Sequence, residues 1–414
     1  MMSILIEQLI NITDAIFLGH VGEIELGASA LAGIWYLAIY MLGFGFSLGL
    51  QVVVARRNGE QRYSETGKTF FQGLFFLSGL AVFLCLLSKL FSPIILSRLI
   101  ASAEVYHAVI DYLDGRIWGL LFSFPFLALR SFLVGITNTK ALNVAALTAV
   151  LVNISGNWLL IFHWDMGIAG AALASSFAEA CSLAVLAIHV LRKMDKRLYG
   201  LSWSFDKGVL LHVFRVSVWS MFHSFIGVAP WFLFFVAIEH LGELQLAVAN
   251  ILRSISTLFF VIVNSFAATT GSLVSNLIGA DERGQVFPLC SRVIRLGYAI
   301  GLPLIVLALV FHQPVVSVYT DNPTIVQTAW LPFVVMLLNY VLALPGYVYM
   351  NAVTGTGATR IAFIFQATTI AAYLLYLWGL SHCDVPLAVY WTVEYLFVIG
   401  LGVQSVIYLK HKHY

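Results

Sequence analysis

The sequence predicts an all-α integral membrane protein with twelve transmembrane helices in two six-helix lobes. Its 414 residues are 60% hydrophobic and only 10% charged, whereas an ordinary soluble domain is about 25% charged. Its apolar runs are long enough to cross a bilayer, and the second half of the chain resembles the first. So few charges cannot cover a soluble surface. The net charge of +2 gives no reason to expect a nucleic-acid partner.

Apolar runs separated by glycine, proline and charged clusters define the helices in order. In the first lobe they predict helices at about 1–19, 24–55, 67–90, 106–136, 141–163 and 167–191. In the second lobe they predict helices at about 208–238, 244–278, 286–311, 322–353, 359–380 and 386–409. Several runs exceed the roughly 20 residues that a span requires, so we expect those helices to tilt or to project beyond the lipid.

The connections between these helices alternate in basic content. Five of them contain no lysine or arginine: 19–24, 163–167, 239–244, 312–322 and 381–385. The connections between these, and the C-terminus, carry basic residues. Because basic loops stay on the cytoplasmic side, we expect both termini in the cytoplasm. Lys89 and Arg98 depart from this pattern, and we expect them on an interfacial segment.

An offset of 220 residues overlays the second half of the chain on the first without a gap. We call it the repeat offset. It carries His20 onto His240, Pro125 onto Pro345 and Lys140 onto Arg360. Six helices is an even number, so both halves enter from the same side, as in a parallel repeat about an axis along the membrane normal. Such two-lobed proteins usually hold a substrate cavity between the lobes and work by alternating access.

The repeat also sets the predicted domain boundaries. The N-terminal lobe covers 1–191, a basic cytoplasmic linker covers 192–207, and the C-terminal lobe covers 208–414. Compared with its counterpart in the second half, the first helix lacks about a dozen residues, so we expect a shortened first helix. Pro125 and Pro345 fall inside helices, where proline marks a kink that could be mobile or static.

Polar residues of three predicted helices reach similar depths in the outer part of the membrane. At 1.5 Å per residue, Asp14 lies ~7 Å, Asn157 ~9 Å and Ser175 ~12 Å from the outer loops. Asn153 precedes Asn157 by four residues and shares its helical face. A carboxylate inside the membrane costs on the order of 3 kcal/mol, so its presence suggests a function. We therefore expect these four residues to form an ion-coupling site.

The chemistry of this site has two forms. A carboxylate in a low-dielectric cleft favours the proton-bound form, so Asp14 could carry H⁺. Amide and hydroxyl oxygens could instead complete a Na⁺ site around it. The alternatives are a hydrated Asp14 at the outer interface, asparagines that only join helices by hydrogen bonds, and a Ser175 that only allows close packing.

Other charged residues are weaker candidates. Glu7 could relay protons or face the cytoplasm, and Glu179 could line a cavity near mid-membrane. Its rough counterpart, Glu394, is expected at the interface. Arg253 could pair with an acidic group or meet an anionic substrate. Arg116 has two aspartates within about a turn, Asp111 and Asp114, so we expect it to be an ion-paired helix end.

The motifs TDAIFLGHVGEIELGASALA, ARRNGE, GITNTK and GTGATR, in two six-helix halves, resemble the multidrug and toxic compound extrusion (MATE) family. The resemblance implies export of organic cations or toxins by H⁺ or Na⁺ antiport, without another cofactor. It maps the family's first-helix aspartate to Asp14 and its helix 6 hydroxyl to Ser175. The helix 5 pattern of the DinF-like branch maps to Asn153 and Asn157, where an amide replaces the second carboxylate. The helix 7 acidic residue of another branch has no counterpart in SVWSMFHSFIGV.

The resemblance thus implies a monomeric antiporter of a bacterial cytoplasmic (inner) membrane, not an enzyme, that exports small amphipathic cations and contacts membrane lipid. A flippase for lipid-linked oligosaccharide is the first alternative, but that group typically has several cavity arginines or lysines, and here Arg253 is nearly alone. A membrane enzyme would need clustered catalytic residues, and His163, His223 and His382 are scattered. No GxxxxGK[ST] motif occurs, so we expect no direct use of ATP.

Overall fold

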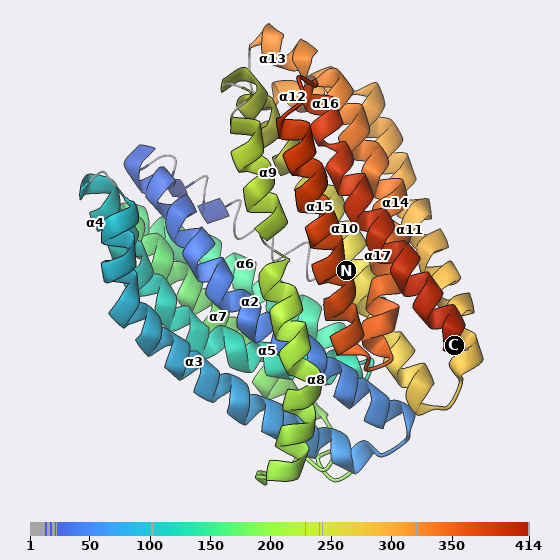
Figure 1. Cartoon of the computed structure of the whole chain (residues 1–414). Helices are drawn as coiled ribbons and strands as arrows, with labels where there is room; N and C mark the ends of the chain where they lie inside the picture. The colour runs from blue at the N-terminus through green and yellow to red at the C-terminus, as the bar shows by residue number, and fades with distance from the viewer. Residues whose placement is uncertain are drawn as a thin grey trace. The chain divides into compact units, whose positions relative to one another are not determined.

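The computed structural model describes residues 13–14, 17–18, 21, 23–100, 103–227, 229–239, 241, 243–319 and 322–412. All regular structure in these ranges is helical (Figure 1). Eleven helices among the described residues are long and apolar enough to cross a membrane. The all-α membrane class is thus confirmed. The count of twelve stays a prediction, because most of the first predicted helix lies outside the described residues.

The chain divides into two compact units, residues 1–224 and 225–414. The first unit contains α2 (Glu23–Gly59), α3 (Tyr63–Leu99), α4 (Ala103–Arg116), η1 (Ile117–Gly119), α5 (Leu120–Gly135), α6 (Lys140–Asn157), η2 (Trp158–His163), α7 (Gly167–Lys193) and nearly all of α8 (Lys207–Ile226). Its core is a cluster of leucines, valines and phenylalanines, including the fully buried Phe46, Phe124 and Phe132. The predicted lobe boundary at the linker comes from the repeat and stays a prediction.

Helix α8 packs against α2 at a glycine contact. A Cβ atom on Gly45 would lie 2.5 Å from the carbonyl oxygen of Ser220. Small residues allow such close approach of two helix backbones in a membrane. This contact helps to explain why α8 lies with the first unit, although the repeat assigns its helix to the second lobe.

The helices of the first unit follow the predicted runs with local departures. Helix α3 continues through Pro93 to Leu99, so Lys89 and Arg98 lie on the transmembrane helix itself. The predicted helix at 106–136 contains a 3₁₀ turn between α4 and α5. The predicted helix at 141–163 ends in the π-helical segment η2. Such π segments are often found at functional sites.

The second unit contains α9 (Ala229–Glu239), α10 (Glu243–Gly279), η3 (Arg283–Gln285), α11 (Val286–Val310), α12 (His312–Ser317), α13 (Pro323–Thr328), α14 (Trp330–Gly355), α15 (Thr359–Ser381), α16 (Leu387–Tyr390) and α17 (Thr392–His411). Its core is centred on α14, which packs against α10 and α17. The predicted helix at 208–238 is interrupted at Gly227 and becomes α8 and α9. Pro345 lies inside α14 and Pro125 inside α5.

The predicted basic linker is folded against α3. The backbone N–H of Gly67 donates to the carbonyl oxygen of Tyr199 at 2.9 Å, and Gln72 Nε2 donates to that of Ser204 at 2.6 Å. The ring of Trp203 lies 5.3 Å from that of Phe71. The linker is therefore a packed element of the first unit rather than a free tether.

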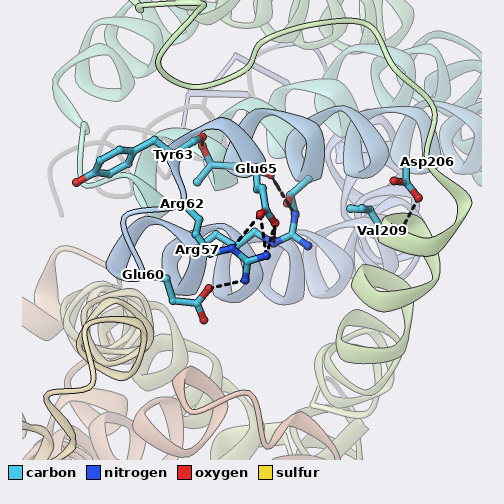
Figure 2. Close-up of polar contacts among 9 residues, drawn as sticks. Arg57, Glu60, Arg62, Tyr63, Glu65, Asp206 and Val209 are labelled. Atoms are coloured by element: carbon cyan, nitrogen blue, oxygen red, sulfur yellow. Dashed lines mark hydrogen bonds and ion pairs between the residues drawn. The ribbon is translucent and has the colours of Figure 1, made fainter.

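Charged residues surround this region at the turn between α2 and α3 (Figure 2). Arg62 pairs with Glu65 at 2.7 Å and with Glu60 at 3.1 Å. These hydrogen bonds raise the pKa of the exposed Arg62 guanidinium above its usual value. Asp206 Oδ1 accepts from the backbone N–H of Val209 at 3.1 Å (Figure 2), which satisfies a free donor in the first turn of α8.

Candidate functional site

Four polar side chains from three separate segments meet in the first unit. Asp14 Oδ1 accepts hydrogen bonds from Asn153 Nδ2 at 2.9 Å and from Asn157 Nδ2 at 2.6 Å. Asp14 Oδ2 accepts from Ser175 Oγ at 2.7 Å. Ser175 Oγ also accepts from Asn153 Nδ2 at 3.0 Å. The structure thus joins the four residues that the depth argument selected, and we call them the Asp14 cluster.

The Asp14 cluster is built on the buried faces of α6 and α7. Asn153 and Asn157 are 0% exposed, because their spacing of four residues keeps both on the face of α6 that is packed inside the unit. Ser175 is 2% exposed on α7, and Asp14 is partly exposed. The carboxylate is therefore only partly enclosed by the described residues.

The charge of Asp14 is balanced by neutral donors only. Within the described ranges, no lysine, arginine or histidine forms an ion pair with it. The Oδ1 atom of Asn157 is buried and has no hydrogen-bond partner, which costs about 1–3 kcal/mol. A proton or a small cation could use both the carboxylate and this spare oxygen.

A second charged cluster lies on α2, α4 and α7. Arg116 Nη2 pairs with Glu179 Oε1 at 2.7 Å, and its guanidinium carbon lies 3.9 Å from the centre of the Tyr36 ring. The Tyr36 hydroxyl also donates to Glu179 Oε1 at 3.2 Å. We call these three residues the Arg116 cluster. Glu179 is thus a partner of an internal cation, which its sequence position alone did not indicate.

The expected local pairing of Arg116 is wrong. Its partner is Glu179 on α7, whereas Asp114 pairs with Lys89 of α3 at 3.0 Å. Asp111 forms no ion pair among the described residues. Helix packing directs Arg116 toward α7, so its guanidinium pairs with Glu179 and not with the aspartates near it in sequence.

The remaining candidates are more isolated. Arg253 is exposed on α10, with its guanidinium carbon 5.0 Å from the ring centre of Phe235, and it forms no ion pair in the described part of the chain. Glu7 lies outside the described residues. Pro125 and Pro345 lie inside helices, and their role as kinks stays a prediction.

Glu394 is enclosed by other residues of the second unit. This residue is only 8% exposed in α17, and its Oε1 accepts a hydrogen bond from the hydroxyl of the fully buried Tyr373 at 3.0 Å. The sequence analysis did not predict this enclosure, and the expected location of Glu394 at the membrane interface stays a prediction. A signal was available in the repeat, because its offset carries Asn153 onto Tyr373 and Ala174, the neighbour of Ser175, onto Glu394.

The sequence was compared with models of known protein families. A family model described as MatE matches residues 1–159 and 220–377, which is more than half of the chain. The chain belongs to the MatE family. This is a family of membrane transporters rather than enzymes, so membership confirms that the protein is not an enzyme. The MATE resemblance is confirmed at the level of the family.

Two bacterial proteins are similar to this MatE protein at low identity. The multidrug resistance protein NorM of Vibrio cholerae serotype O1 is 23% identical over 418 residues, which cover 95% of this chain and 88% of that protein. A probable multidrug resistance protein NorM of Geobacillus kaustophilus is 24% identical over 326 residues, which cover 76% of this chain and 71% of that protein. The chain is thus a NorM-like, multi-pass member of the family.

Solved structures share its fold. An outward-facing structure of a multidrug resistance MATE family transporter of the MOP superfamily matches with a TM-score of 0.90 at 18% identity, over 99% of this chain and 93% of that one. A MOP superfamily transporter from Pyrococcus furiosus matches with a TM-score of 0.88, also at 18% identity, over 99% and 93% of the two chains. At these identities the likeness establishes the fold alone.

Proposed function

We propose that this MatE protein is a secondary active antiporter that exports small organic cations in exchange for H⁺ or Na⁺ bound at Asp14. The observation that carries the proposal is a carboxylate held by Asn153, Asn157 and Ser175, with no basic partner among the described residues. The NorM relatives are multidrug resistance proteins, which supports drug-like amphipathic cations as the substrate class.

The Asp14 cluster suits reversible ion binding because its amides can serve two charge states. An amide carries donors on its nitrogen and acceptor sites on its oxygen. With Asp14 ionised, the nitrogen of Asn157 faces the carboxylate at 2.6 Å and its oxygen has no partner. A half-turn of the amide would present the oxygen to a protonated Asp14 or to Na⁺. Replacing a second carboxylate by an amide thus leaves Asp14 as the single charge of the site.

The rest of the proposed setting follows from the sequence. The protein would act as a monomer in a bacterial cytoplasmic membrane with both termini inside, and its two repeated lobes would alternate access to the substrate. The Asn153 and Asn157 pair favours assignment to the DinF-like branch. Export would bring the substrate and the coupling ion to the same membrane face in turn, as alternating access requires.

The test is transport of a fluorescent cation by purified protein in liposomes. Ethidium movement would be followed with a pH gradient, a Na⁺ gradient or neither, for the unchanged chain and for Asp14→Asn. Asp165→Asn is the matched control, because Asp165 is an exposed aspartate outside the cluster. We expect transport with one gradient, its loss in Asp14→Asn and its retention in Asp165→Asn.

Two outcomes would overturn the proposal. Unchanged gradient-driven transport in Asp14→Asn would remove the coupling role of this residue. Absence of cation transport under either gradient, together with movement of a fluorescent lipid-linked sugar between leaflets, would establish the flippase instead. The isolated, exposed Arg253 argues against that alternative, because an anionic lipid headgroup needs several basic partners.

A further inference from the structure

A small cavity lies inside the second unit, between α10, α14 and α17. Its volume is about 60 Å³. Five aromatic side chains form much of its wall: Phe259, Phe260, Tyr340, Tyr347 and Trp391. Cavities that hold a whole drug-sized molecule are roughly 300–1,000 Å³. This space therefore fits a small chemical group rather than a complete drug.

The polar part of this wall includes a carboxylate and an amide oxygen. Glu394 is 8% exposed, and Tyr373 is the only donor to its carboxylate among the described residues, at 3.0 Å. Asn339 also lines the cavity, and its Oδ1 atom is buried without a hydrogen-bond partner among those residues. The described lining includes no lysine, arginine or histidine, so its N–H and O–H donors are neutral. A buried carboxylate with only neutral donors near it can take a cation or a proton as its counter-charge.

We propose that this cavity binds the ammonium group of an organic cation, with Glu394 as its counter-ion. Its role in export rests on the proposed antiporter function, whereas binding itself does not. Aromatic faces attract a desolvated cation by about 2 kcal/mol. A carboxylate at the edge of an aromatic wall thus provides both charge and shape for an alkylammonium head.

The wall fits an organic cation better than an inorganic one. A hard metal ion needs about six oxygen ligands, and two of the hydroxyls here already donate to backbone carbonyls. Tyr340 donates to the carbonyl oxygen of Gly297 at 2.8 Å, and Ser256 to that of Arg253 at 2.8 Å. Glu394 and Asn339 supply few free oxygens, so the aromatic rings must provide most of the contact.

The Arg116 cluster shows the same chemistry within this protein. There a guanidinium lies 3.9 Å from the centre of the Tyr36 ring and 2.7 Å from Glu179. A cation, an aromatic face and a carboxylate thus combine in the first unit with the cation supplied by the chain. In the second unit the chain supplies the aromatic face and the carboxylate, and a bound ligand would supply the cation.

The position of Glu394 in the repeat gives independent support. Helices α7 and α16 begin at Gly167 and Leu387, which correspond under the repeat offset. The same offset carries Asp14 onto Phe234, whose ring lies 5.1 Å from that of Trp391. The second unit therefore has an acidic residue, Glu394, in the region that corresponds to the Asp14 cluster. This residue lies on the last helix, α17.

The test is equilibrium dialysis of the full chain in detergent against radiolabelled tetramethylammonium, without any ion gradient. We expect saturable binding that weakens about tenfold in Glu394→Gln, because the variant keeps the shape and loses the charge. Glu282→Gln, an exposed glutamate in the same unit, is the matched control and should bind as the unchanged chain. Monodisperse elution and an unchanged unfolding midpoint establish that each variant is folded.

A second variant leaves the carboxylate intact. Ala343 lines the cavity, so Ala343→Leu should fill the space and abolish tetramethylammonium binding while Glu394 remains. Binding that survives both Glu394→Gln and Ala343→Leu would overturn the proposal, as would no binding by the unchanged chain. Displacement of tetramethylammonium by equimolar Na⁺ would assign the site to an inorganic ion and also overturn it.

The same assay separates this site from the proposed function. Asp14→Asn should weaken tetramethylammonium binding less than Glu394→Gln does, because Asp14 belongs to the other unit and does not line the cavity. If gradient-driven transport fails while this binding pattern holds, the antiporter function is wrong and the ammonium site stands. If transport behaves as expected while Glu394→Gln has no effect on binding, only the ammonium site is wrong.

Discussion

The two units treat a buried carboxylate in opposite ways. In the first unit, Asp14 is held by three donors, from Asn153, Asn157 and Ser175. In the second unit, Glu394 has one donor, Tyr373, and lines a cavity with aromatic walls. The difference suggests two tasks, because a carboxylate among amides and hydroxyls suits a proton or Na⁺, and one among aromatic rings suits an alkylammonium group.

Glu179 is a third acidic residue with which Asp14 and Glu394 can be compared. Its charge is balanced inside the protein by Arg116 at 2.7 Å, so it needs no ligand. Asp14 and Glu394 have no such partner among the described residues. Three buried or half-buried acids therefore differ in how far the chain itself balances their charge, and the following predictions measure that difference.

The largest expected effect separates transport from binding. Asp14→Asn should reduce gradient-driven ethidium transport by at least about tenfold, because it removes the charge that receives three hydrogen bonds, each worth about 1.5–3 kcal/mol. It should weaken tetramethylammonium binding less than Glu394→Gln does. Parallel transport and dialysis measurements on both variants check this, and equal effects of the two variants on both readouts would contradict separate tasks.

Breaking the internal ion pair should come next. Arg116→Met leaves the half-buried Glu179 without its ion-pair partner but with its hydrogen bond from Tyr36, so we expect the free energy of unfolding in detergent to fall by about 2–3 kcal/mol. The double variant Arg116→Met with Glu179→Leu should recover most of this loss, because no buried charge remains. Thermal unfolding measures both. A double variant as unstable as the single one would show that packing, not charge, explains the loss.

Removing one donor from the Asp14 cluster should have a smaller effect. Asn157→Leu keeps the side-chain size but loses both the donor and the spare oxygen, so we expect transport to fall several-fold, about the value of one hydrogen bond to a charged group. Ser155→Ala is the control, since Ser155 lies on the exposed face of the same helix. Equal transport by both variants would mean that Asn157 only packs.

The exposed ion pair at the turn between α2 and α3 should matter least. Glu65→Gln removes the contact with Arg62 at 2.7 Å, but the Arg62 side chain is 55% exposed. We expect a loss below about 1 kcal/mol, smaller still in high salt. Unfolding midpoints at low and high salt measure it. A loss as large as that of Arg116→Met would contradict the distinction between exposed and buried pairs.

The sequence by itself determined the membrane class, the helical segments and the residues of the Asp14 cluster. Hydropathy and the spacing of Asn153 and Asn157 are properties of single helices, so they can be read without knowledge of packing. The position of Asp14 inside an apolar run was equally local. The MatE membership followed from motifs spread over both halves of the chain.

Only the tertiary structure decided which groups meet. It pairs Arg116 with Glu179 instead of its neighbouring aspartates, buries Glu394 beside a cavity, and packs the basic linker against α3. The physical reason is that helical spacing fixes the face on which a side chain lies, whereas the rotation and packing of the helices fix what that face contacts. The charge balance of a buried acid is therefore a property of the assembled unit.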